Sequence, residues 1–294
     1  MTGANGFIGA HLVRHFSSDG WDVRALMHRE PAQRLPGVVY RRWTLADPLG
    51  QDVLDGADCV IHGAFVKYDQ RSASHLNIVG SERLLAECRA GGVGRIVFLS
   101  SMSARRDALS QYGRDKFRIQ EALDGPRELV VRPGLVLGDG GLFHSLQRFV
   151  SGRPVVPLVG GGQQLIQTVH IDDLASAIQA GVRLALSGIV TVAERVPIPF
   201  RELLAETARL LGVRVVFVPV PYRAIDFAMR VAALLRVRLP VSPDNLLGLR
   251  GLEAQDVGPD LQRLGIDVRD YRASLRAILS GASQFDPDAR GTGS

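Results

Sequence analysis

Short apolar runs alternate with amphipathic segments along the first half of the chain. The runs of strand length are 22–27, 38–43, 58–65, 95–101 and 128–134. Between and around them, the segments 7–16, 75–92 and 110–125 repeat their apolar residues with the period of a helix. Strands that alternate with helices are typical of βαβ units, which build parallel sheets. We therefore predict an α/β protein with a Rossmann-like doubly wound parallel sheet.

The pattern loosens after about residue 140. One further amphipathic helix is predicted over 169–186, with Asp172 or Asp173 as its N-cap. Beyond it, helical stretches such as FRELLAETARLLG mix with short strands such as VRVVFVPV, which indicates a small C-terminal α/β lobe. The predicted organisation is a Rossmann domain over 1–140 with elements from 160–186, a mainly substrate-binding lobe over 141–284 and a flexible tail over 285–294.

The segment AIDFAMRVAALLRVRL (224–239) is apolar on much of its surface, with arginines at intervals. A helix of this kind can lie on a membrane surface, but we favour a helix that covers the substrate lobe. No run reaches the roughly 18 consecutive apolar residues that indicate a membrane-spanning helix. The N-terminus lacks the basic and then apolar leader of a secreted protein, so we expect a cytoplasmic protein.

Composition narrows the choice of partners. The net charge is +5, but 33 of the 35 basic residues are arginine, because Lys67 and Lys116 are the only lysines. The arginines are dispersed, which favours a solvated surface and no nucleic-acid partner. Cys59 and Cys88 lie in apolar segments without the spacing of metal ligands, so we predict buried free thiols and no metal site.

The stretch TGANGFIG (2–9) places three glycines directly before an amphipathic helix. Glycines at this spacing let the backbone approach a pyrophosphate, which the free N–H groups of the helix N-terminus then bind. Such a turn normally follows a buried strand, yet the chain begins at Met1. We predict a truncated first strand and expect a natural form with several apolar residues before Thr2, because this strand is central in a doubly wound sheet.

The residues after the second strand bear on the choice of cofactor. An acidic residue there suits the ribose hydroxyls of NAD, whereas an arginine suits the 2′-phosphate of NADP. The chain reads His28, Arg29 and Glu30, so the cation comes first. We therefore favour NADP(H) over NAD(H), with Glu30 keeping NAD(H) open.

The stretch SSMSARRDALSQYGRDK (100–116) predicts a proton-transfer site. A strand ends at Ser101, and Tyr112 and Lys116 follow at positions i and i+4 of a helix, on one face. An ammonium beside a phenol is expected to lower the pKa of the tyrosine. A serine hydroxyl at the strand end can hold a substrate oxygen, so this pattern fits an alcohol–carbonyl reaction coupled to hydride transfer by a nicotinamide.

Four stretches of the chain resemble one known superfamily. They are TGANGFIG (2–9), VIHGAF (60–65), LNIVGSERLLAECRAGGVGRIVFLSS (76–101) and GGGQQLIQTVHIDDLASAI (160–178). With YGRDK and RPG, they resemble the short-chain dehydrogenases/reductases, and within them the extended and atypical members grouped as NAD-dependent epimerases/dehydratases. The resemblance covers residues 2 to about 186 and is thin afterwards.

The resemblance implies roles for individual residues. Ser101 is then the catalytic serine, with Ser103 as a second candidate. Tyr112 is the acid/base and Lys116 is its activator, which also holds the nicotinamide ribose, while Asn77 supports the proton relay of the lysine. The glycines of the turn bind the pyrophosphate, and the RPG stretch lines the nicotinamide side. The predicted cofactor contacts are Gly3, Asn5, Gly6, Phe7, Ile8, Gly9, Arg29, Ala64, Tyr112, Lys116, Arg132 and Pro133.

This resemblance implies an NAD(P)-dependent oxidoreductase, epimerase or dehydratase that acts on an alcohol–carbonyl pair. The substrate is less clear. Eleven residues from Ser101 to Tyr112 is a short spacing for a sugar-nucleotide epimerase. Ile166, Gln167 and Thr168 stand where sugar-nucleotide enzymes usually carry Arg-Asp-aromatic. A nucleotide-sugar substrate is disfavoured and left open.

An alternative comes from LPVSPDNLLGLRGLEAQDV (239–257), which weakly resembles the nucleotide-binding accessory subunit of respiratory complex I. That resemblance implies a non-catalytic NADP(H)-binding structural or assembly protein. Tyr112 and Lys116 favour the enzyme, since a purely structural subunit has no need of the pair. The partners we expect are a small-molecule substrate and, as an open alternative, a second copy of the chain in a homodimer.

Overall fold

The structure is a computed structural model, and it describes residues 1–31, 33–66, 72–221 and 243–282. The helix predicted over 224–239 and the tail predicted over 285–294 lie outside the described residues.

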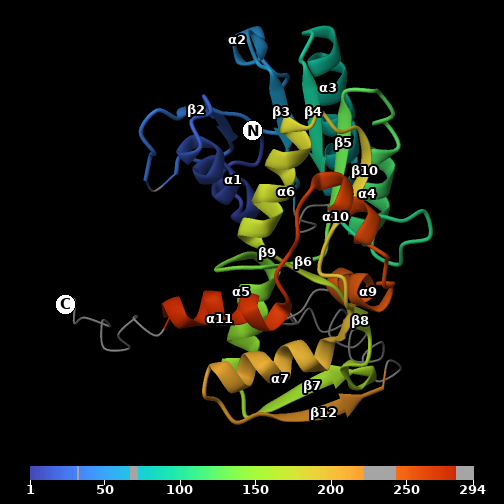
Figure 1. Cartoon of the computed structure of the whole chain (residues 1–294). Coiled ribbons are helices and arrows are strands. Elements are labelled where there is room, and N and C mark those ends of the chain that lie inside the picture. Colours follow the sequence, from blue (N-terminus) through green and yellow to red (C-terminus); the bar gives the residue numbers. More distant parts are fainter. Residues whose placement is uncertain (32, 67–71, 222–242, 283–294) are drawn as a thin grey trace, which may run out of the picture.

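A parallel sheet forms the centre of the upper half of the molecule in Figure 1. Its strands lie in the order β10 (Gly188–Val192), β5 (Glu128–Pro133), β4 (Arg95–Leu99) and β3 (Cys59–His62). A second parallel pair, β1 (Arg24–Met27) and β2 (Val39–Arg42), continues the sheet beside β3. All of these strands except β10 fall inside the apolar runs named above, and the predicted doubly wound α/β fold is confirmed.

The first residues of the chain lie between β1 and β3. The Leu26 N–H donates to the carbonyl of Met1 (2.8 Å), and the Thr2 N–H donates to the carbonyl of Ile61 (2.9 Å). The amino group of Met1 donates to the carbonyl of Arg24 at 2.7 Å, and burial lowers its pKa to about 6. Thr2 therefore stands at the predicted central position of the sheet, with one residue of pairing on each side.

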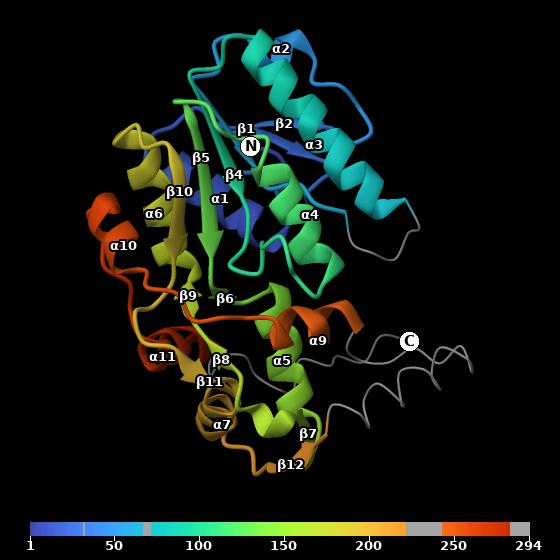
Figure 2. The same ribbon diagram turned by 90° about the vertical axis from the view of Figure 1, so that its right-hand side faces the viewer.

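Helices cover both faces of the sheet (Figure 2). On one face, α1 (Phe7–Ser18) packs against α6 (Ile171–Arg183), and α10 (Gly258–Leu264) extends this layer. On the other face, α3 (Ala73–Ala90) packs against α4 (Gln111–Gln120), with the short helix α2 (Gln51–Leu54) beyond them. Each layer buries its own apolar cluster against the sheet, which is how amphipathic helices are held in this fold.

The ends of two helices have local causes. Helix α4 begins after Ser110, whose hydroxyl accepts the N–H of Gly113 at 3.1 Å. The prediction of Asp172 or Asp173 as the N-cap of α6 is wrong. His170 ends the preceding strand in an extended conformation and caps the helix through its ring, which accepts the Asp172 N–H at 3.2 Å.

Short strand pairs and helices lie below the carboxyl ends of the sheet (Figure 1). The pairs are β6 (Leu135–Leu137) with β9 (Thr168–His170), β8 (Leu165–Ile166) with β11 (Ile198–Pro199), and β7 (Val155–Val159) with β12 (Val216–Val220). The helices are α5 (Gly141–Ser151), α7 (Phe200–Leu210), α9 (Pro243–Arg250) and α11 (Tyr271–Ala282), with a 3₁₀ turn at Gly160–Gly162. A third apolar cluster joins these elements.

Candidate active site

The glycine-rich turn leaves room for no side chain at two of its positions. Gly3 has a φ of +70°, and a Cβ there would lie 2.8 Å from the backbone of Gly63 and Ala64. A Cβ on Gly9 would lie 2.1 Å from the carbonyl oxygen of Gly3. Gly6 is the N-cap of α1 and has no side chain that could accept hydrogen bonds from the free N–H groups of the helix. These groups are therefore open to an anion, as a pyrophosphate site requires.

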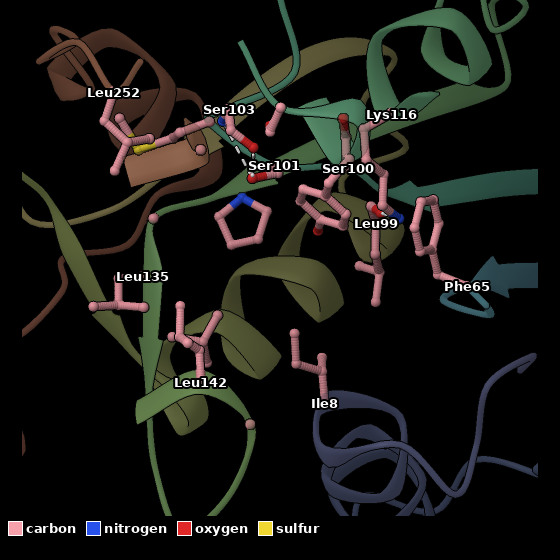
Figure 3. Close-up of a pocket in the computed structure, with 18 of the residues that line it drawn as sticks. Ile8, Phe65, Leu99, Ser100, Ser101, Ser103, Lys116, Leu135, Leu142 and Leu252 are labelled. Carbon is pink, nitrogen blue, oxygen red and sulfur yellow. Dashed lines mark hydrogen bonds between the residues drawn. The ribbon is translucent and has the colours of Figure 1, made fainter. Parts of the chain in front are cut away.

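A cavity of about 430 Å³ lies beside this turn, at the carboxyl ends of the strands. Its walls come from the turn, from the segments that follow β3, β4 and β5, from α4 and from α9. The topology explains the position, because parallel strands place the loops that follow them at one edge of the sheet. In Figure 3, Ser101 and Ser103 lie between Lys116 at one end of the cavity and Leu252 at the other.

The predicted serine, tyrosine and lysine all line this cavity. The hydroxyls of Ser101 and Ser103 are 2.9 Å apart, and Ser101 also shares a hydrogen bond with Tyr112. Lys116 is buried, and its Nζ donates to the carbonyl of Leu99 at 2.6 Å. That Nζ lies 4.5 Å from the ring centre of Phe65 and 5.9 Å from that of Tyr112.

The expectation that Lys116 lowers the pKa of Tyr112 is wrong for this structure. Burial raises the pKa of Tyr112 to about 12, and the hydrogen bond to Ser101 opposes that shift. Burial also lowers the pKa of Lys116 to about 7. The cause in both cases is the cost of placing a charge in a poorly solvated cavity. At neutral pH, Tyr112 is thus a protonated phenol, which can donate a proton.

Several predicted site residues lie outside this cavity. Asn77 is buried, but its amide exchanges two hydrogen bonds with the backbone of Val66 (2.7 and 3.0 Å), whereas Lys116 donates to the carbonyl of Leu99. The Nε of Arg132 donates to Gln120 at 3.1 Å. Three other predicted site residues, Asn5, Arg29 and Ala64, also lie outside the cavity.

These three residues nevertheless lie close to the turn. The Asn5 amide donates to the carbonyl of Arg29 at 3.5 Å, which brings the end of β1 next to the glycines. The N–H of Ala64 donates to the hydroxyl of Thr2 at 3.2 Å. The predicted contacts Gly3, Gly6, Phe7, Ile8, Gly9 and Pro133 line the cavity itself.

Sequence reasoning missed the part of the wall that comes from residues 244–253. Asp244, Gly248, Leu249, Leu252 and Glu253 all line the cavity. They lie in the region where family motifs are thin, and no spacing rule links them to Tyr112. Phe65, which directly follows the VIHGA run, was also missed, although its position after a strand end could have indicated it.

Two further properties of the described residues concern metal ligands and membrane-spanning helices. Among the described residues, no group of three or more His, Cys, Asp or Glu side chains could hold a metal ion. No helix in the described part of the chain is both long enough and apolar enough to cross a membrane.

Comparisons with known proteins match the chain to one family. The pattern of the NAD dependent epimerase/dehydratase family matches residues 1–188. Ceramide reductase of Caulobacter vibrioides is 30% identical over 73% of this chain and 70% of its own. The 2-alkyl-3-oxoalkanoate reductase of Stenotrophomonas maltophilia is 30% identical over 85% of this chain and 84% of its own. These matches confirm the predicted resemblance.

A solved structure supports the fold. MoeE5, in complex with UDP-glucose and NAD, superposes with a TM-score of 0.73, covering 96% of this chain and 97% of that chain. The two sequences are 22% identical, so the likeness shows the shared fold alone.

Proposed function

Because the chain belongs to the NAD dependent epimerase/dehydratase family and resembles two relatives named as reductases, we propose that it is an NADPH-dependent reductase of a ketone on a mainly apolar substrate. The observation that carries this proposal is the placement of Tyr112, hydrogen-bonded to Ser101 and next to Lys116 in one apolar cavity. A protonated phenol suits the reductive direction, in which the carbonyl oxygen gains a proton.

The glycine-rich turn fits the dinucleotide that this reaction needs, because its backbone forms a cradle that a Cβ at Gly3 or Gly9 would fill. When bound, the nicotinamide supplies the hydride that reduces the carbonyl carbon. The Tyr112 hydroxyl gives its proton to the carbonyl oxygen, so the ketone gains a hydride and a proton in total, and Tyr112 is left as the phenolate. Ser101 donates a hydrogen bond to that oxygen and holds it beside the phenol.

Lys116 is the group that offsets the charge left on Tyr112. Loss of the proton creates a phenolate in a poorly solvated cavity, where an unpaired charge is costly. The Lys116 ammonium lies on the same helix face and is the one positively charged side chain among the described residues that line the cavity. With a pKa of about 7, the Lys116 amine is close to its protonated form at neutral pH, and a neighbouring phenolate favours that form.

The cavity favours an apolar substrate over a nucleotide sugar. Its described lining includes Phe65, Met102, Leu142 and many other apolar side chains. Two relatives with 30% identity are named as reductases, one of ceramide and one of a 2-alkyl-3-oxoalkanoate. We therefore place the substrate among ketones with alkyl chains.

NADPH is proposed as the preferred cofactor. Arg29 is the second residue after β1, and the Asn5 hydrogen bond to its carbonyl ties it to the phosphate-binding turn. A guanidinium there suits the 2′-phosphate of NADP.

The test is a rate assay in which NADPH and NADH are each offered with 3-oxo esters of different chain length and with UDP-glucose. We expect oxidation of NADPH with the 3-oxo esters, more slowly with NADH, and no reaction with UDP-glucose. Tyr112→Phe should lower kcat/KM by about 1,000-fold, since positioned acid catalysis contributes about 10² to 10⁴, and it should leave NADPH binding intact.

Tyr40→Phe is a matched control, because the Tyr40 hydroxyl accepts the Leu35 N–H and does not line the cavity. Full activity of Tyr112→Phe, or turnover of UDP-glucose but of no ketone, would refute the proposed function.

A further inference from the structure

The first free N–H groups of helix α4, which carries Tyr112, donate to side chains from two different parts of the chain. The hydroxyl of Ser110 accepts the N–H of Gly113 at 3.1 Å, as an ordinary N-cap does. The N–H groups of Gln111 and Tyr112 instead donate to the two carboxylate oxygens of Asp244, at 2.6 and 3.2 Å. Asp244 comes from α9, 132 residues after Tyr112.

This contact is stronger than a neutral cap. A carboxylate at a helix N-terminus gains both charge-assisted hydrogen bonds and a favourable interaction with the helix dipole. Asp244 holds the backbone N–H of Tyr112 itself, so it fixes the point from which the phenol extends. Gly248, one turn further along α9, lies against Ser110, where a Cβ would be 3.5 Å from the hydroxyl.

Asp244 lies near the start of residues 243–255, a segment that we call the strap. From α9 the strap crosses the carboxyl ends of the sheet toward α10 (Figure 2). Two more anchors hold its far end. Glu253 pairs with Arg105 at 2.5 Å, and Gln255 exchanges hydrogen bonds with the side chain of Gln167 at 2.8 and 3.0 Å.

Between its anchors, the strap faces the cavity with apolar side chains. Leu249 and Leu252 line the cavity, and Figure 3 shows Leu252 at the end opposite Lys116. A substrate whose apolar part fills that end would therefore press on the same segment that holds the backbone of Tyr112.

We propose that Asp244 is a positioning residue for Tyr112, and that the strap couples the apolar part of the substrate to the placement of the proton donor. This inference rests on the proposed function of Tyr112. It adds that the strap, through Asp244, determines both which chain length fits and how well the phenol is aligned. A substrate with a longer alkyl chain then reacts faster, because its contact with the strap holds Asp244 against the N–H of Tyr112.

The test compares Asp244→Ala and Asp244→Asn with the wild type on 3-oxo esters of increasing chain length. We expect kcat to fall about tenfold in Asp244→Ala, since small misplacements of reacting groups cost up to about 100-fold. Asp244→Asn keeps one acceptor oxygen and should recover part of the loss. The rise of kcat with chain length should flatten in Asp244→Ala, and the Kd for NADPH should stay unchanged.

Glu87→Ala is the matched control. The Glu87 carboxylate also accepts a backbone N–H from another element, that of Leu49 at 2.7 Å, but it does not line the cavity. Loss of this contact should lower stability and leave the chain-length profile as in the wild type. A kcat and a profile in Asp244→Ala equal to those in Glu87→Ala would overturn the inference.

Hydrogen exchange gives a second measurement that needs no turnover. The amides of residues 111–112 should lose protection in Asp244→Ala and keep part of it in Asp244→Asn, and unchanged protection would overturn the inference. The two proposals fail separately. An active Tyr112→Phe refutes the proposed function, whereas an inactive Tyr112→Phe with an unaffected Asp244→Ala refutes the strap alone.

Discussion

Two cavities of nearly equal size lie at opposite edges of the same sheet. The one at the carboxyl edge, of about 430 Å³, contains the glycine turn, Ser101, Tyr112 and Lys116. The one at the amino edge, of about 440 Å³, lies beside Met1 and is lined by both apolar and charged side chains, such as Phe16 and Asp22. The charged residues Asp19 and Arg183 of the amino-edge cavity pair with each other.

Volume alone therefore does not identify a site. The parallel strands all point toward the carboxyl edge, and α1 begins there, so its uncapped N-terminal N–H groups face that cavity. Burial in that cavity also shifts the pKa values of Tyr112 and Lys116, as is common at functional sites. The amino-edge cavity instead lies beside Met1, between the first residues of β1 and β3.

The largest expected change in cofactor affinity comes from adding a methyl group to the glycine turn at the carboxyl edge. Gly3→Ala would place a Cβ 2.8 Å from the backbone of Gly63 and Ala64 and displace the turn. We expect the Kd for NADPH to rise by about 10- to 100-fold, because overpacking costs about 1–3 kcal/mol. Fluorescence titration with NADPH measures this.

Gly37→Ala is the control for backbone strain. Gly37 has a φ of +75°, close to that of Gly3, but an added Cβ there meets nothing within 4 Å. Both variants should lose stability, by about 1 kcal/mol from strain alone. Only Gly3→Ala should weaken NADPH binding, and an equal Kd in the two variants would contradict the assigned cradle.

The next effect, which is smaller per pH unit, is on the pH dependence of the free energy of unfolding. Burial lowers the pKa of Lys116 to about 7 from its usual 10.5. Between these values the unfolded chain holds a proton that the folded chain has released, so the free energy of unfolding rises with pH across this window. The slope is up to about 1.4 kcal/mol per pH unit.

Lys116→Met should lose this contribution. Urea denaturation of both proteins between pH 7 and 10 measures the difference, and other groups that titrate in this range cancel in the comparison. We expect the wild type to gain stability relative to Lys116→Met as pH rises, because its penalty is largest at low pH. A difference that does not change with pH would show that Lys116 is not buried as described.

The smallest expected effect comes from filling the amino-edge cavity. A variant with four apolar residues added before Met1 should be more stable, by about 1 kcal/mol, because the new segment can pair with β1 and β3. Its amide also replaces the buried amino group of Met1. A Gly-Ser extension of the same length is the control, and kcat should change less than about twofold. Equal melting temperatures for the two extensions would contradict the predicted gain.

Most strands and helices of the first 140 residues could be predicted because their signals are local. The strand at 95–101 and the helix at 110–125 each carry a clear periodicity, and the strand direction places Ser101, Tyr112 and the glycines at one edge. The i and i+4 spacing places Lys116 beside Tyr112 without knowledge of any other element.

The remaining features depend on tertiary contacts. The pKa of Tyr112 is governed by burial, which no spacing reveals. The contact between Asp244 and the Tyr112 N–H joins segments 132 residues apart. His170 caps α6 because a strand leads directly into that helix, whereas residue preference alone favours an aspartate.

The most direct test follows the hydride and the proton together. The wild type is incubated with NADPH that carries deuterium at the transferring position of the nicotinamide, and with a 3-oxo ester. We expect deuterium on the carbinol carbon of the product, at a rate that falls about 1,000-fold in Tyr112→Phe. A product without deuterium at that carbon, or equal rates in the two proteins, would contradict reduction by proton transfer from Tyr112.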